Sequence, residues 1–219
     1  MNAEKRCMEN KLRLRFSKTD KLRFIGHLDF LRVFQQMIRR SGLPIAYSQG
    51  FNPHQIVSFA LPLPLGMESI HDYADITLTT HIPADEIAKI LNDAAPQGLT
   101  ILAAYLVHGA NAASATVAAD YVIATDSPSQ SAITKILQSE TLIIPKKTKS
   151  GIKNTDIRPD IFAIDITEKG LQMRLSAGSA RFLNPLLVAE QILQTAPCNS
   201  AISRIELYQG DDAGAFKPL

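Results

Sequence analysis

Two histidines and one carboxylate are the residues of this sequence best suited to acid–base chemistry. His27 and Asp29 stand at the start of a segment with helical periodicity, and His54 lies in the turn "GFNPH". A histidine beside a carboxylate can act as a general acid or base, and a helix N-terminus can hold a phosphate. Because residues at spacing i, i+2 do not share a helical face, His27 and Asp29 could pair only in a pre-helical geometry. A structural role, ligand contact and catalysis therefore stay open for these two residues.

Basic side chains form a second candidate set, suited to binding rather than to catalysis. Cationic strands and lysine-rich loops suit a phosphate backbone, whose binding strengthens with the number of phosphates neutralised. The set comprises Arg13, Arg15, Arg32, Arg39 and Arg40 near the N-terminus and Lys146, Lys147, Lys149, Lys153 and Arg158 in "PKKTKSGIKNTDIRP". This distribution favours a sequence-tolerant contact with RNA, with an ordinary solvated surface as the alternative.

The stretch "YSQGFNPH" predicts a tight loop that displays polar and aromatic groups. Asn52 and Pro53 are a strong turn signal, and Gly50 permits a positive φ. Tyr47, Gln49 and His54 would then stand at the edge of the loop, where planar groups stack on or hydrogen-bond to unpaired bases. A purely structural use of the loop is the alternative.

Several other kinds of site are excluded by motif and composition. The sequence has neither GxxxxGK[ST] nor GxGxxG, which excludes the common nucleotide-binding loops. Its aromatic content is 6% without tryptophan, and no pair of RNA-stacking aromatics stands on one predicted strand. Cys7 and Cys198 are too few for a zinc site or an iron–sulfur cluster. The five histidines have no metal-ligand spacing. We therefore expect no metal and no cofactor.

The elements that must position these residues follow from periodicity. "KLRLRF" alternates apolar and basic residues, which predicts a strand with one cationic face in water. Apolar residues then recur at helical spacing from Gly26 to Arg40, and Gly42 ends the helix. Strands are predicted at "LPIAYS", "QIVSFALPL", "DYADITLTT" and "LTILAAYLV", with a helix at "PADEIAKILNDAA".

After the small-residue linker "HGANAASAT" the same order of elements returns. We expect strands at 117–125, 141–145, 161–167, 171–176 and 201–208 and helices at 129–139 and 184–195, with a mobile basic loop over 145–159. Both halves therefore predict the split βαβ plan, in which two helices cover one face of an antiparallel sheet. The expected fold is α+β, with two tandem ferredoxin-like sandwiches over residues 1–109 and 110–219.

Charge and hydropathy restrict where in the cell the protein is expected and which partners it can have. Residues 1–50 are strongly basic and residues 51–145 are acidic, although the net charge is only +2. The N-terminal stretch carries charges where a signal peptide is apolar, and prolines break the longest apolar run. We therefore expect a cytoplasmic protein that makes no contact with a membrane.

Three blocks of sequence together resemble a known family. "GHLD", "YSQGFNPH" and "ALPLPLG", followed by "KKTKSGIKNTDIRP", are similar to the bacterial radical-SAM-linked protein family, which carries the domain DUF2344. The resemblance covers nearly the whole chain and points to the stand-alone form, since in this family the domain also occurs fused to a radical SAM protein with a cobalamin-binding domain. It implies a radical SAM protein as partner and RNA or ribosome-related chemistry as the setting. Without a CxxxCxxC triad, this chain is expected to be the accessory protein rather than the radical-generating enzyme.

Three hypotheses about function follow. The first is an accessory protein that presents RNA or an RNA–protein substrate to a radical SAM enzyme. The second is an enzyme, because tandem ferredoxin-like folds also house metal-independent ribonucleases and His27 could be a general base. The third is a pure protein-interaction module. No complete catalytic set is visible, which favours a role other than that of an enzyme.

Overall fold

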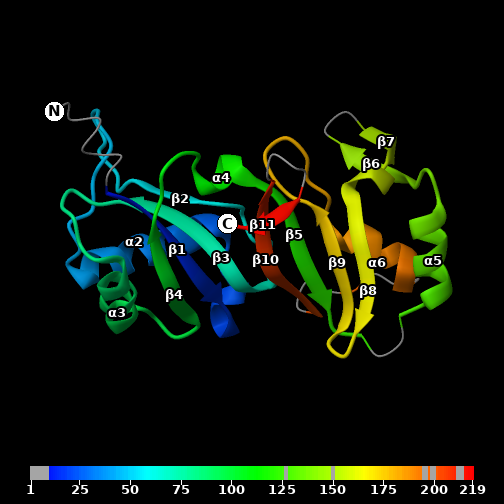
Figure 1. The fold of residues 1–219 in the computed structure, drawn as a ribbon, viewed down its shortest axis with the longest axis horizontal. Helices are drawn as coiled ribbons and strands as arrows, with labels where there is room; N and C mark the ends of the chain where they lie inside the picture. Colours follow the sequence, from blue (N-terminus) through cyan, green and yellow to red (C-terminus); the bar gives the residue numbers. More distant parts are fainter. Residues whose placement is uncertain (1–9, 126–127, 149–150, 194–196, 198–200, 211–214) are drawn as a thin grey trace.

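The computed structural model describes residues 10–125, 128–148, 151–193, 197, 201–210 and 215–219, and for 146–148 it describes the backbone alone. The elements are β1 (Lys11–Lys18), η1 (Asp20–Phe24), α2 (His27–Ser41), β2 (Val57–Phe59), β3 (Glu68–Thr77), α3 (Ala84–Ala94), β4 (Leu99–Leu106), α4 (Ala112–Ala115), β5 (Thr116–Ile123), α5 (Gln130–Gln138), β6 (Ile143–Thr148), β7 (Gly151–Asp156), η2 (Arg158–Asp160), β8 (Ile161–Thr167), β9 (Gly170–Ser176), α6 (Pro185–Leu193), β10 (Ile202–Gly210) and β11 (Phe216–Pro218). The fold is of the α+β class (Figure 1).

In the described chain, nine strands form one sheet. Their order is β4-β1-β3-β10-β5-β9-β8, with β2 paired to β3 and β11 paired to β10. The pairs are antiparallel except for β3 with β10. The expectation of a separate sheet in each half is therefore wrong, because β3 and β10 join the two sets of strands edge to edge.

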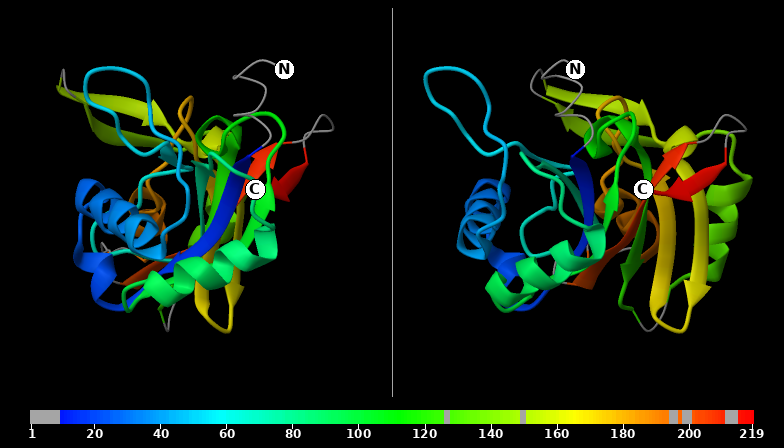
Figure 2. Two further views of the ribbon diagram at one scale, coloured as in Figure 1. Left: turned by 90° about the vertical axis from the view of Figure 1, so that its left-hand side faces the viewer. Right: turned by 60° about the vertical axis from the view of Figure 1, so that its left-hand side comes forward.

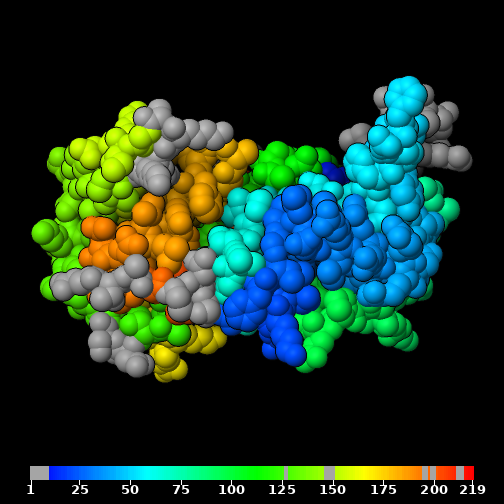
Figure 3. Space-filling view, turned by 180° about the vertical axis from the view of Figure 1, so that it is seen from behind, coloured from blue at the N-terminus to red at the C-terminus, as the bar shows by residue number. Residues whose placement is uncertain are grey.

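Four helices cover one face of this sheet. Helices α2 and α6 lie behind the sheet in the view of Figure 1, α5 lies beside the edge strand β8 and contacts α6, and α3 packs beside α2 and against β4. Seen from the opposite side in Figure 3, α2 and α6 face the viewer, over different halves of the sheet. The other face of the sheet carries none of these four helices.

An aromatic cluster fixes α2 on the first half of the sheet. Strand β1 turns Leu12, Leu14 and Phe16 toward the helix. The Phe16 ring lies 5.5 to 5.8 Å from the rings of Phe30, Phe34 and Phe59. Spacing i, i+4 places Phe30 and Phe34 on one helical face, so burial of this face determines where α2 docks.

A second core fills the other half and is closed by capped helices. Ser129 caps α5 by accepting a hydrogen bond from the N–H of Ala132. The Asn184 side chain accepts from the N–H of Leu186, with Pro185 at the first position of α6. Both caps agree with the helix starts predicted from the sequence. The buried residues of this core include Tyr121, Ile133, Leu171, Met173 and Val188.

A buried ion pair links the two halves beneath the junction of β3 and β10. Arg204 is fully buried, and its Nη2 donates to Asp72 Oδ2 at 2.5 Å. The same guanidinium donates to the carbonyl oxygens of Leu61 and Pro62, in the "ALPLPLG" segment. Arg204 belongs to β10, and these three partners belong to the first half, so its side chain bonds across the junction between the two halves.

The predicted loop over 145–159 is instead a hairpin. Strands β6 and β7 pair with each other in a two-stranded sheet, from Ile143 opposite Asp156 to Thr148 opposite Gly151, and η2 follows. Ile144 at the base of β6 is buried, but residues 151–154 of β7 are all exposed, so this part of the hairpin lacks the alternation of apolar and polar residues that marks a half-buried strand. Lys149 lies outside the described residues.

The predicted strand at "LPIAYS" is reduced to two isolated bridges. Ile45 pairs with Leu78, and Tyr47 pairs with Gln55. Pro44 has no N–H to donate to a ladder, which limits the pairing. Among the described residues, no helix is both long enough and apolar enough to cross a membrane.

Replacing Arg204 by methionine is expected to destabilise the protein by about 3–5 kcal/mol, because Asp72 would stay buried without its main cationic partner. The measurement is the free energy of unfolding in urea. Arg32→Met, at an exposed surface pair, is the control and should change it by less than about 1 kcal/mol. Recovery of stability in the double variant Arg204→Met, Asp72→Leu would identify the unpaired carboxylate as the cause, whereas a small effect of Arg204→Met alone would show that the pair does not hold the halves.

Candidate nucleic-acid interface

Two elements project from the same end of the molecule. One is the loop formed by residues 46–56, here the projecting loop, and the other is the β6–β7 hairpin, residues 143–156, here the basic hairpin. Both views of Figure 2 show them rising from that end, the loop over the first half and the hairpin over the second. In the space-filling view of Figure 3 the projecting loop stands clear of the body.

Backbone and side-chain hydrogen bonds stiffen the projecting loop. The N–H of Ser48 donates to the carbonyl of His54 at 2.8 Å, and the N–H of His54 donates to Ser48 Oγ at 3.1 Å. The His54 ring is tied to the same hydroxyl through Nδ1 at 2.8 Å. His54 therefore helps to hold the loop while remaining on its surface.

The tip of the projecting loop carries a fully exposed aromatic ring. Phe51 is 105% exposed and Tyr47 is 47% exposed, and Gln49 is also exposed. Gly50 takes a φ of +122°, which a residue with a side chain rarely adopts, so this glycine allows the chain to reverse before Phe51. An aromatic ring held in water on a stiff loop is suited to stacking with an unpaired base.

Phe51 did not emerge as a candidate from the sequence. It stands alone between Gly50 and Asn52, with no periodic partner, and a loop phenylalanine is by itself ambiguous. Its near neighbours Tyr47, Gln49 and His54 were predicted. The available signal was an apolar ring inside a run of turn-forming residues, where burial is rare.

The register of the basic hairpin sets two lysine positions opposite one another. Lys146 lies opposite Lys153, and Lys147 lies opposite Ile152. Lys153 is exposed, and Ile152 is 77% exposed. The hairpin thus offers apolar contact together with positive charge.

Arg158 follows the basic hairpin in the chain and bonds to the body of the protein. Its Nη1 donates to the carbonyl of Ile161, and its Nη2 donates to the carbonyl of Leu137 at the end of α5. These bonds anchor the hairpin to the body. Its position therefore favours a structural role over the predicted contact with RNA.

The predicted cationic surface of β1 and α2 does not form as one patch. Because residues alternate along a strand, Arg13 and Arg15 lie on the sheet face opposite the one that α2 covers. Arg15 is half-buried, with its Nε lacking a partner in the described chain. On α2, Arg39 is exposed, and Arg40 donates to the carbonyl of Ala94 at the end of α3.

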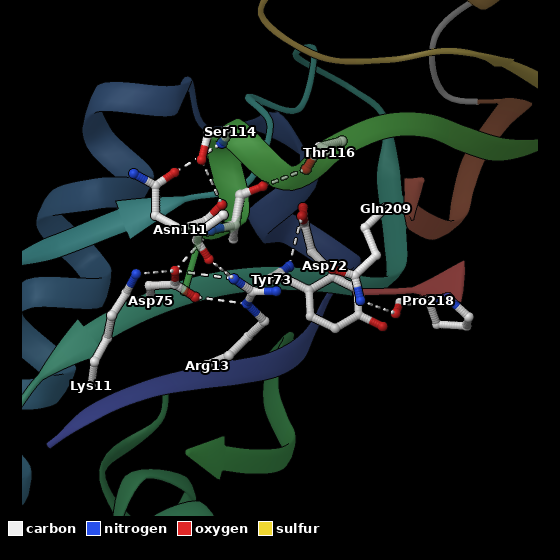
Figure 4. Close-up of polar contacts among 12 residues, drawn as sticks. Lys11, Arg13, Asp72, Tyr73, Asp75, Asn111, Ser114, Thr116, Gln209 and Pro218 are labelled. Atoms are coloured by element: carbon white, nitrogen blue, oxygen red, sulfur yellow. Dashed lines mark hydrogen bonds and ion pairs between the residues drawn. The ribbon is translucent and has the colours of Figure 1, made fainter. Parts of the chain in front are cut away.

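Arg13 is buried in an ion pair rather than displayed to solvent. Figure 4 shows its guanidinium against Asp75, with Nε 2.8 Å from Oδ1. Lys11 Nζ lies 3.3 Å from the same carboxylate, which also accepts from the N–H of Ala112 at 2.8 Å. The prediction of a wholly cationic wet face on this strand is wrong, because Asp75 arrives from the neighbouring strand β3 and neutralises it.

Other carboxylates on the sheet face opposite α2 are paired in the same way. Asp120 accepts two hydrogen bonds from Arg174, at 2.7 and 2.8 Å, and a third from the hydroxyl of Tyr208. Burial and the bond to Asp120 raise the pKa of Tyr208 to about 12. Tyr73 donates to Glu206 at 2.6 Å. Internal pairing leaves this face without a cationic strip.

The catalytic candidates His27 and Asp29 contact different residues. Asp29 is exposed and pairs with Arg32 at 2.8 Å, and no described hydrogen bond or ion pair joins it to His27. His27 packs edge-on against Phe59, with the ring centroids 5.6 Å apart. It lines a cavity of about 10 Å³ together with Lys18 and Asp72. A space of this size admits no substrate.

Lys18 is the most perturbed base beside that cavity. It is 1% exposed, its Nζ donates to the carbonyl of Ile25 at 3.1 Å, and it lies 4.7 Å from the centre of the Phe30 ring. Burial lowers its pKa to about 8, although the negative charge of Asp72 opposes this shift. Among the described residues, no three His, Cys, Asp or Glu side chains gather where they could hold a metal ion.

The chain matches a family model described as an uncharacterized protein conserved in bacteria (DUF2344), over residues 11–185. The match includes the projecting loop, the "ALPLPLG" segment and the basic hairpin. No curated protein matches the chain.

The buried amine of Lys18 predicts a pH-dependent stability. Between about pH 8 and 10.5 the unfolded chain binds a proton that the folded chain does not, so the free energy of unfolding rises with pH in this window. We expect the wild type to gain about 1–3 kcal/mol over Lys18→Met across it. Urea unfolding at several pH values measures this difference, and a flat difference would show that the amine is not desolvated.

Phe51→Ala is expected to weaken binding of a single-stranded RNA by about 5- to 150-fold, since stacking of one base on an aromatic ring contributes about 1–3 kcal/mol. Its free energy of unfolding should not change, because the ring makes no buried contact. Fluorescence anisotropy with a labelled oligonucleotide measures the affinity. Phe24→Ala is the matched control, since Phe24 is 63% exposed on η1, outside both projections. Equal losses in the two variants would argue against the tip as a binding site.

Proposed function

The chain belongs to the DUF2344 family, and we propose that it is an accessory protein that presents RNA, or an RNA–protein substrate, to a radical SAM enzyme. The radical SAM partner is proposed from the resemblance of "GHLD", "YSQGFNPH" and "ALPLPLG" to the radical-SAM-linked proteins. The RNA is proposed from the two projections at one end of the molecule.

The observation that carries the proposal is the exposed ring of Phe51 on a stiff loop, at the same end as a lysine-bearing hairpin. Stacking and phosphate contact are the two interactions by which proteins hold single-stranded nucleic acid. The loop supplies the first and the hairpin the second. Neither interaction reads base edges, so the binding is tolerant of sequence.

We also propose that each half is a ferredoxin-like unit, with residues 1–109 and 110–219 as the two domains. The strand order is β4-β1-β3-β2 in the first half and β10-β5-β9-β8 in the second. In both halves the last strand of the main sheet comes first in this order, followed by the first, the third and the second, and this shared order supports the proposal. The two core clusters follow nearly the same division of the chain. The exceptions are four residues of the first half that pack into the second core, Ala60, Leu63, Met67 and Tyr73. The two units share one sheet and act as one platform for the projections.

A protein-interaction module is the second candidate, and an exposed apolar group favours it. Phe24, Leu28 and Leu65 are 63%, 69% and 56% exposed. The hydrogen bond from the N–H of Gly66 to the carbonyl of Arg23 joins the segments of Phe24 and Leu65, and Leu28 stands on the first turn of α2. Complex formation with a protein that is insensitive to salt and needs no RNA would favour this candidate over the first.

Salt dependence tests the role of the basic hairpin. Replacing Lys146, Lys147 and Lys153 by glutamine should reduce the slope of log affinity against log salt by about 2, because each phosphate contact on a single strand contributes about 0.7. The measurement is RNA binding at several salt concentrations. A triple variant of Lys89, Lys135 and Lys169, exposed lysines outside the hairpin, is the control. An equal reduction in both triple variants would show that net charge, rather than the hairpin, governs binding.

A further inference from the structure

A pocket on the second half has no role in the interface described above. Its volume is about 320 Å³, which is ample for a nucleobase. The described residues that line it come from α4 and the start of β5, from η2 and β8, and from the segment after β9. Three separate stretches of chain therefore meet around one hollow.

One wall of the pocket is aromatic. Phe162 lines it and is 43% exposed, although it stands on a strand of the main sheet. Its ring lies 4.8 Å from the ring of Phe216, on β11, and Phe216 lies 6.3 Å from Tyr208. The guanidinium of Arg174 covers the Tyr208 ring at 4.2 Å. These contacts hold Phe162 in place while leaving part of its ring open to the pocket.

A second wall of the pocket is the segment "AGSAR", residues 177–181, which offers unpaired backbone donors. The segment is fixed at both ends, by the N–H of Ala177 on the carbonyl of Val117 and by the N–H of Leu183 on the carbonyl of Ser176. Within the described chain, the N–H groups of Gly178, Ser179 and Ala180 make no hydrogen bond. Consecutive free N–H groups are suited to holding an anion.

Gly178 and Arg181 shape this wall. Gly178 has a φ of +156°, and a Cβ on it would lie 2.3 Å from the carbonyl oxygen of Thr116, so no other residue fits there without moving the backbone. Arg181 Nε lies 2.8 Å from Asp160 Oδ1, and Ser176 Oγ donates to the same oxygen at 2.9 Å. Asp160 thus orients the guanidinium, which is 59% exposed at the rim of the pocket.

We propose that this pocket binds a nucleoside monophosphate unit, either free or as one residue of a single strand. The base stacks on Phe162, and the phosphate is held by the N–H groups of 178–180 and the guanidinium of Arg181. A bare phosphate would leave the aromatic wall unused, and an uncharged base would leave the donors unpaired. Both walls are satisfied only by a ligand with a planar ring and an anionic group a few ångströms apart.

The position of the pocket suggests how a strand would pass. The segment 177–182 lies at the same end of the molecule as the two projections, between the projecting loop and the basic hairpin (Figure 1). A strand that reaches from Phe51 to the hairpin would cross it. This link to RNA rests on the proposed function, whereas the pocket itself does not.

The test is calorimetric titration of the intact protein with AMP, UMP, adenosine and inorganic phosphate. We expect the monophosphates to bind with a Kd of about 1 mM or tighter and to outbind adenosine and phosphate. Phe162→Ala should weaken AMP binding by about 5-fold or more. The control Ile166→Ala lies on the same strand with a similar exposure of 44%, and it should have no effect.

Arg181→Gln separates the two walls. It should weaken AMP binding while leaving any adenosine binding unchanged, because the guanidinium contacts the phosphate alone. No AMP binding by the folded wild type up to about 10 mM would overturn the proposal, as would AMP affinity unaltered in both Phe162→Ala and Arg181→Gln.

The same titrations distinguish failure of the pocket from failure of the proposed function. RNA binding that depends on Phe51, without AMP binding, would reject the pocket as a nucleotide-binding site and would leave the proposed RNA-presenting role intact. AMP binding that depends on Phe162, without RNA binding, would support the pocket as a site for a free nucleotide and would reject the proposed RNA-presenting role. Phe51→Ala should leave AMP affinity unchanged in either case.

Discussion

Arg204 and Asp72 meet in an interior from which water is excluded, and the shared sheet depends on their contact. The parallel pairing of β3 with β10 spans only two residue pairs, Ser203 with Glu68 and Arg204 with Ser69. So short a ladder provides few hydrogen bonds, and the side chain of Arg204 adds bonds to Asp72, Leu61 and Pro62. A buried charge of this kind tolerates little change, because a loss on either side leaves the other unpaired.

The junction explains why two distant stretches of chain can act together. With both halves in one sheet and their helices on one face, the projecting loop and the basic hairpin rise from the same end. The "ALPLPLG" segment supplies the carbonyls that receive Arg204, so a block of sequence that marks the family resemblance has a defined structural task. On the sheet face opposite α2, Asp75, Asp120 and Glu206 neutralise or occupy the polar groups around them.

Periodicity predicts the long elements and fails over the exposed part of the basic hairpin. Helix α2 and strands β1, β5 and β9 carry clear apolar spacing, and the predicted α+β class is confirmed. The pairing of β6 with β7 is not predicted from periodicity, because residues 151–154 are all exposed. The exposure predicted for Arg13 is wrong because its partner, Asp75, comes from another strand. Phe162 and Phe216 are far apart in the sequence, so their pairing could not be read from spacing. Sites assembled from separate strands depend on the register of the sheet.

The most direct test of the RNA-presenting role is ultraviolet crosslinking in cells, followed by denaturing purification of the protein and peptide mapping by mass spectrometry. We expect RNA attached to peptides that contain Tyr47 and Phe51 and to peptides of the basic hairpin, with loss of the first set in Phe51→Ala. An absence of crosslinked RNA, or crosslinks confined to the sheet face opposite α2, around Tyr105, would contradict it.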